Sequence, residues 1–139
     1  MLCLDTPTFG SHCFTMDTSS PETYFLSPTS HVPNSRLPVL VYRQVLSTAT
    51  TAESVRESIE KNHWFQGGIW KAFKTHHFHS VTHESYAAFK GRSRLLLGRG
   101  PLDSEDAGVE VDIEAGDVIV LPVRHIPSLS LVIFKADIS

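Results

Sequence analysis

The stretch THHFHSVTHESY, residues 75–86, contains four of the eight histidines of the chain. In a β-strand, side chains alternate between the two faces, so His77 and His79 would point the same way, with Cα atoms about 6.6 Å apart. Two imidazoles at this spacing can converge on one ion, and Glu84 can swing back as a carboxylate ligand. Two histidines and one carboxylate with open positions are typical of non-haem Fe(II) oxygenases. The competing interpretation is that these are ordinary polar side chains on a sheet face.

The pattern around this stretch is β from Ile69 onward. Short segments rich in β-branched and apolar residues are separated by turns that contain glycine and aspartate. Strands of this length and spacing predict an antiparallel sandwich or barrel. The expected strands are 69–73, 76–81, 84–90, 92–97, 109–114, 117–121 and 129–134.

The N-terminal part divides into a tail and the start of the domain. Residues 1–22 are rich in Thr, Ser, Pro and Asp and have no sustained period, so we expect a flexible tail. Residues 23–139 then form a single domain. Within it, two further strands are expected at 23–26 and 39–46 (VLVYRQVL).

One short helix is expected in the N-terminal half of this domain. Thr50 is predicted as its N-cap, and Glu53 would complete a capping box. Asn62 is the predicted C-terminal stop. Because the helix is short, tertiary packing must hold it, through an apolar face at helical spacing formed by Ala52, Val55 and Ile59.

Composition limits the classes of function. The chain has 139 residues, of which 41% are hydrophobic, and 12 Lys+Arg against 15 Asp+Glu give a net charge of −3. This balance argues against a nucleic-acid partner, which normally requires a concentrated basic face. No run of 18 apolar residues predicts a membrane span, and the first residues lack a signal-peptide pattern. We therefore expect a soluble cytoplasmic protein.

The histidine-rich stretch resembles the first motif of the cupin superfamily. That motif reads His-x-His, three or four residues, Glu, six residues, Gly. Here His77, His79, Glu84 and Gly91 meet every spacing.

The second cupin motif reads Gly, five residues, Pro-x-Gly, two residues, His, and this chain meets it in part. Gly116 and Pro122 have the expected spacing, but Arg124 stands where the second glycine is expected. His125 follows the proline by three residues instead of five. His125 is a fourth candidate ligand. The spacing is two residues shorter than in the motif, so the sequence leaves open whether His125 reaches the other ligands.

Residues 23–125 are similar in order to a group of small single-domain cupins. These occur in bacteria as poorly characterised proteins and in fungal polyketide gene clusters, notably those making salicylaldehyde-type aromatics, as cupin-domain oxidoreductases. The resemblance implies a mainly β, double-stranded β-helix (jelly-roll barrel) with one short N-terminal helix. It also implies a divalent transition metal (Fe, Mn or Zn) inside the barrel, on His77, His79, Glu84 and His125.

The function implied by the resemblance is an enzyme, a metal-dependent oxidoreductase that acts on a small aromatic or polyketide-derived intermediate. Two alternatives remain open, because the same ligands serve oxidation and isomerisation. One is a non-redox isomerase or cyclase. The other is a non-catalytic cupin that binds a small ligand, which the altered second motif favours.

Other residues have secondary roles in this prediction. Tyr86 alternates in phase with Glu84, so it should face the interior, where it can fill the core or donate a hydrogen bond to a substrate. His83 is either a pocket residue or a structural turn residue, and His76 is expected to be structural. Only 14 residues follow His125, which leaves either a shortened domain or an open sheet edge suited to a homodimer.

Overall fold

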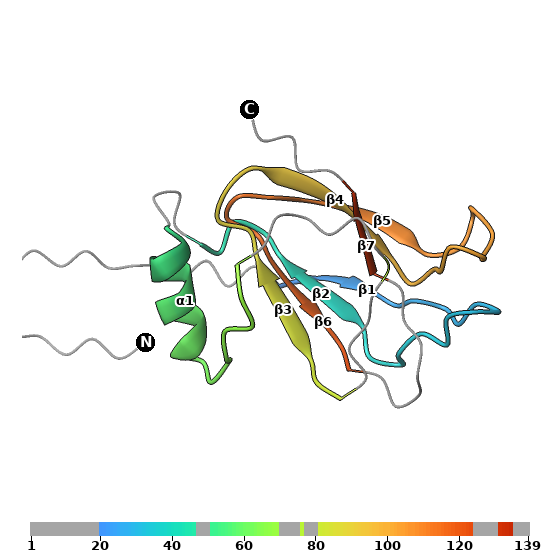
Figure 1. Ribbon diagram of the computed structural model, residues 1–139, viewed down its shortest axis with the longest axis horizontal. Helices are drawn as coiled ribbons and strands as arrows, with labels where there is room; N and C mark the ends of the chain where they lie inside the picture. The colour runs from blue at the N-terminus through green and yellow to red at the C-terminus, as the bar shows by residue number, and fades with distance from the viewer. Residues whose placement is uncertain (1–19, 47–50, 70–75, 77–80, 124–130, 135–139) are drawn as a thin grey trace, which may run out of the picture.

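The computed structural model describes residues 20–46, 51–69, 76, 81–123 and 131–134. These residues form two antiparallel sheets and one short helix (Figure 1). The described part of the chain contains the elements β1 (Glu22–Tyr24), β2 (Val39–Tyr42), α1 (Ala52–Glu60), β3 (Glu84–Ala87), β4 (Arg92–Leu97), β5 (Val109–Glu114), β6 (Val118–Leu121) and β7 (Leu131–Phe134).

The strands of the first sheet are ordered β1-β2-β6-β3, and those of the second β5-β4-β7. In the first sheet, Val41 of β2 pairs with Ile119 of β6, and Ile119 in turn pairs with Tyr86 of β3. Residues opposite one another on paired strands share a face of the sheet. These three side chains therefore lie on the same face.

A hydrophobic core joins the two sheets. In β2 and β5 alternate residues face inward, as the period of two predicts. In β5, for example, Val111 is buried while Glu110 and Asp112 are exposed. The buried core cluster combines side chains of both sheets: Val39, Val41 and Ile119 of the first, and Leu95, Leu97 and Val111 of the second.

The mainly β prediction with one short helix is confirmed. The bounds of β4 and β5 match the expected strands, and β7 (Leu131–Phe134) lies within the expected strand 129–134. The expected strands 69–73 and 76–81 fall largely on residues outside the described ranges, as do residues 1–19 of the expected tail. No described strand of one sheet pairs with a strand of the other, so a closed jelly-roll barrel stays a prediction.

The strand β2 is shorter than predicted, because a turn follows Tyr42 directly. Gln44 has a positive φ of 51°, and its backbone N–H donates to the carboxylate of Asp117 at 3.0 Å. The prediction that this strand continues to residue 46 was wrong. The partner that fixes the turn lies 73 residues further along the chain, and local sequence does not reveal it.

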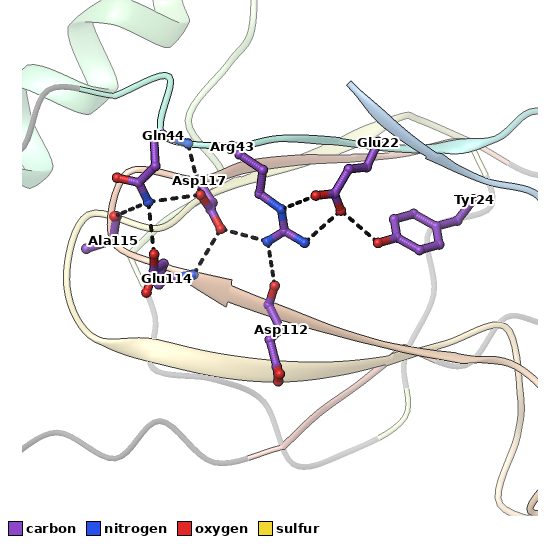
Figure 2. A network of polar contacts seen from close by, with 8 residues as sticks. All are labelled: Glu22, Tyr24, Arg43, Gln44, Asp112, Glu114, Ala115 and Asp117. Carbon is purple, nitrogen blue, oxygen red and sulfur yellow. Dashed lines mark hydrogen bonds and ion pairs between the residues drawn. The ribbon is translucent and has the colours of Figure 1, made fainter. Parts of the chain in front are cut away.

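A polar network at this end of the molecule links the two sheets (Figure 2). The Asp117 carboxylate is 1% exposed. It accepts hydrogen bonds from the Arg43 guanidinium at 2.8 Å and from the backbone N–H of Glu114 at 3.2 Å. Arg43 also forms a two-point contact with Glu22, at 2.8 and 2.7 Å. The network thus ties β1 and the end of β2 to the β5–β6 turn.

The helix α1 is capped one residue later than predicted. Thr51, not Thr50, is the N-cap, and Ser54 replaces Glu53 as its capping partner. The Thr51 side chain accepts from Ser54 N at 3.2 Å, and Thr51 N donates to Ser54 Oγ at 2.9 Å. Thr50 and Thr51 are the same residue type and equally good N-caps, so the sequence alone did not distinguish the two. Within the described ranges, no helix has the length and apolar character that crossing a bilayer requires.

Candidate functional site

A cavity of about 610 Å³ lies between α1, the segment 64–69 that follows it, and the inner face of β3. Figure 1 shows α1 at one end of the sandwich, beside β3. The volume falls in the range of small-molecule sites. Glu84, the carboxylate ligand predicted from the sequence, lines this cavity, so we take the cavity as the candidate site.

All four residues of β3 line the cavity. Glu84 pairs with Leu121 and Tyr86 pairs with Ile119, so both side chains lie on the inner face, as their phase predicted. Burial raises the pKa of the Tyr86 hydroxyl, and the charge of Glu84 and a hydrogen bond with its side chain raise it further. Tyr86 therefore remains a protonated donor beside the Glu84 carboxylate at physiological pH.

The wall opposite β3 is the apolar face of α1. Val55 is the buried residue of the helix. Ala52 and Ile59 lie one turn on either side of it, on the same face, and both line the cavity. Trp64 continues this wall, and Leu95 and Ile113 close the space from the second sheet. Most of the enclosed surface is therefore hydrophobic.

Charged side chains also line this cavity. Three are cationic, Arg56, Lys90 and Arg92, and two are carboxylates, Glu60 and Glu84. Arg56 pairs through Nη2 with Glu53 at 3.2 Å. Its Nε is withdrawn from solvent and has no hydrogen-bond partner among the described residues.

Sequence reasoning missed Arg56. The available signal was its place next to Val55, at the border of the apolar stripe of the expected helix.

Of the predicted metal ligands, the described residues include only Glu84. His77, His79 and His125 lie outside the described ranges. Among the residues that the structure does describe, no three His, Cys, Asp or Glu side chains gather as a metal site would require. The structure therefore brings the carboxylate to the cavity and leaves the histidine part of the prediction untested.

His83 lines the cavity and also holds the chain in place. Its ring Nδ1 accepts a hydrogen bond from the backbone N–H of Val123 at 2.9 Å. A backbone N–H can only donate, so the hydrogen of the neutral ring is on Nε2. A metal-bound histidine needs one nitrogen for the metal and normally donates from the other. With this hydrogen bond in place, neither nitrogen is arranged to bind a metal ion in that way. The bond fastens the start of β3 to the segment after β6, and because His83 also lines the cavity, its role as a pocket residue or as a structural turn residue stays a prediction.

His76 is half-buried, and its environment keeps it neutral. Burial lowers the pKa of the ring, and the nearby positive charge of Arg99 lowers it further. Within the described part of the chain, Nδ1 is buried without a hydrogen-bond partner.

The glycines that matched the two motifs lie in turns that touch each other. Gly91 and Gly116 have φ values of +74° and +105°, a conformation that favours glycine. The backbone N–H of Ala115 donates to Gly91 O at 2.8 Å, and that of Gly116 donates to Ala88 O at 2.8 Å. The two motif segments are thus adjacent in space.

The chain is similar in sequence to a bacterial protein. No protein-family model matches it, and neither does any solved structure. It is 26% identical over 102 residues to a protein described as "Uncharacterized protein YjlB" of Bacillus subtilis (strain 168). The match covers 73% of this chain and 56% of the relative, so the chain spans little more than half of that protein's length.

Proposed function

We propose that this chain is a small metal-dependent cupin that acts as an oxidoreductase on an aromatic or polyketide-derived molecule. The observation that carries the proposal is the position of Glu84. It lies on the inner face of β3 and lines a cavity of small-molecule size. The proposed ligands of the metal ion are His77, His79 and Glu84, with His125 as a fourth.

The chemistry of this donor set fits a divalent transition metal. Neutral imidazole nitrogens and one carboxylate suit iron, manganese or zinc. Such an ion supplies Lewis acidity or one-electron chemistry to a bound oxygen-containing substrate. The contact between the two motif segments, through Ala115 and Gly91, supports the proposal because both segments are expected at one metal site.

The surrounding residues have separate tasks in this proposal. The helix wall around Val55 and Ile59 excludes water from an apolar substrate. Tyr86, whose raised pKa keeps its hydroxyl protonated, has one proton to donate, which either orients the Glu84 carboxylate or binds a substrate oxygen. A charge-assisted hydrogen bond of this kind fixes the carboxylate more firmly than a neutral one would.

A non-redox isomerase or cyclase would use the same residues, and oxygen uptake during turnover distinguishes it from an oxidase or oxygenase. A non-catalytic ligand-binding cupin is the second candidate. It is favoured by Arg124 in place of the second-motif glycine and by the shortened spacing to His125. This candidate predicts a cavity that binds small molecules without a transition metal.

Metal analysis of purified variants tests the proposal. The wild-type chain should retain about one transition-metal ion per chain, and His77→Ala, His79→Ala and Glu84→Gln should each lose most of it. Glu57→Gln is the matched control, because Glu57 is exposed on α1 and does not line the cavity. Equal metal content in all five proteins would contradict the proposal.

A further inference from the structure

The guanidinium of Arg56 has a donor that the described protein does not use. Its Nη2 contacts Glu53, but its Nε is buried and has no hydrogen-bond partner among the described residues. A buried N–H without an acceptor destabilises the folded chain unless something else accepts from it. Because Arg56 lines the cavity, a molecule bound there is in reach of this side chain.

The charges around the cavity favour an anion. Its lining holds the cations Arg56, Lys90 and Arg92 against the carboxylates of Glu60 and Glu84. This excess of positive charge contrasts with the net charge of −3 of the whole chain. Low-dielectric walls strengthen the attraction of an anion to such a site.

The apolar side chains of the lining favour a ligand whose remaining part is hydrophobic. Val55, Ile59 and Trp64 form one wall, and Leu95 and Ile113 lie across from them. The cavity volume of about 610 Å³ suits a molecule the size of one or two aromatic rings. Arginine presents its N–H donors in a planar fork that matches a carboxylate.

We propose that the cavity binds an apolar monocarboxylate, with the carboxylate on Arg56 and the hydrocarbon body against α1 and the second sheet. An apolar monocarboxylate would be the substrate class of the proposed function. Only the statement that the bound molecule is a substrate rests on that function. Binding itself does not require the metal.

Calorimetry on the whole chain tests this with two probes, 2-naphthoate and its neutral analogue 2-naphthamide. The wild type should bind the naphthoate at least about tenfold more tightly, the usual effect of a charged hydrogen bond. Arg56→Gln should abolish this preference without changing the affinity for the amide. Arg36→Gln is the control, because Arg36 is exposed and lies outside the cavity lining. It should behave as wild type.

Two further variants keep the test decisive. Arg56→Lys retains the charge but not the planar fork, so it should prefer naphthoate over the amide by a smaller factor than the wild type. This variant serves as the test if Arg56→Gln is poorly folded. In Glu84→Gln the preference should persist. If the preference for naphthoate disappears in Glu84→Gln and survives in Arg56→Gln, the carboxylate of the ligand binds near Glu84 and not at Arg56. That result would overturn the inference.

Equal affinity of the wild type for both probes would also overturn the inference. If the metal analysis contradicts the proposed function but the wild type still prefers naphthoate, the chain is a carboxylate-binding protein and not a metal-dependent enzyme. The two failures are therefore distinguishable.

Discussion

The Arg43 guanidinium donates a 2.8 Å hydrogen bond to the carboxylate of Asp117, a residue 74 positions further along the chain (Figure 2). The pair joins the end of β2 to the β5–β6 turn. That turn also hydrogen-bonds the residues after β3, through Gly91 and Ala88. The position of β3, and hence of Glu84, therefore depends in part on a carboxylate outside the cavity.

Asp117→Ala should destabilise the chain substantially. The substitution removes the acceptor of Arg43 and of the backbone N–H groups of Gln44 and Glu114. We expect a loss of about 3 kcal/mol in the free energy of unfolding, because several donors lose a buried carboxylate acceptor at once. Urea unfolding measures it. Asp112→Ala, at an exposed carboxylate that pairs with Arg94, should have a far smaller effect, and equal losses would contradict the prediction.

Stability should fall at acid pH through the same network. Hydrogen bonding from Arg43, and less strongly from Tyr24, lowers the pKa of Glu22 to about 2. Burial alone would raise the pKa of Asp117, but hydrogen bonds from Gln44 and Arg43 outweigh it and lower the pKa.

Carboxylates with depressed folded-state pKa values stabilise the fold above their unfolded pKa values, near 4. We expect the contribution of these two carboxylates to be constant above about pH 5 and to be lost as the pH drops towards 2, so the melting temperature should fall steeply over that interval. Arg43→Met should lower stability at neutral pH and flatten this acid slope. An unchanged slope in the variant would show that other groups control it.

Two glycines with nearly equal φ should differ in their tolerance of alanine. Gly91 has φ +74° and open space where a Cβ would lie, whereas Gly108 has φ +76° and a Cβ there would be 2.5 Å from Leu97 O. Gly91→Ala should cost about 1–2 kcal/mol, from backbone strain alone. Gly108→Ala should cost more, because the clashing atom belongs to the backbone. Chemical denaturation compares the two, and equal costs would contradict the account.

Replacing His83 should leave the metal content unchanged. His83→Ala removes the acceptor of Val123 N, which we expect to cost about 1 kcal/mol of stability. Because Nδ1 is already engaged, the variant should bind as much metal as the wild type, whereas His77→Ala should not. Loss of metal in His83→Ala at full stability would make His83 a ligand.

Local sequence was sufficient to predict the bounds of β4 and β5. In 109–114 apolar and charged residues alternate, and one face is buried. In 92–97 the signal was the apolar run Leu95–Leu97, which is buried throughout, between the turns at Gly91 and Gly98. Local sequence also placed Glu84 and Tyr86 on the inner face of β3. The end of β2 was not predictable, since Asp117 fixes the turn at Arg43 and Gln44 from across the fold.

The helix wall of the site shows the same limit. The spacing of Ala52, Val55 and Ile59 predicted an apolar face, but not that this face borders a cavity over β3. The role of Arg56 emerges only from its packing, because an arginine on a short helix is ordinarily solvated. Sequence therefore predicted which side chains form the apolar face of the helix, while the cavity beside that face required the fold.

X-ray absorption spectroscopy of the zinc-loaded chain tests the central claim most directly, because it counts the imidazoles bound to the ion. The account predicts scattering from at least two imidazoles and one carboxylate in the wild type, with one imidazole fewer around the residual zinc that His79→Ala retains. A spectrum without imidazole scattering, or one unchanged in His79→Ala, would contradict it.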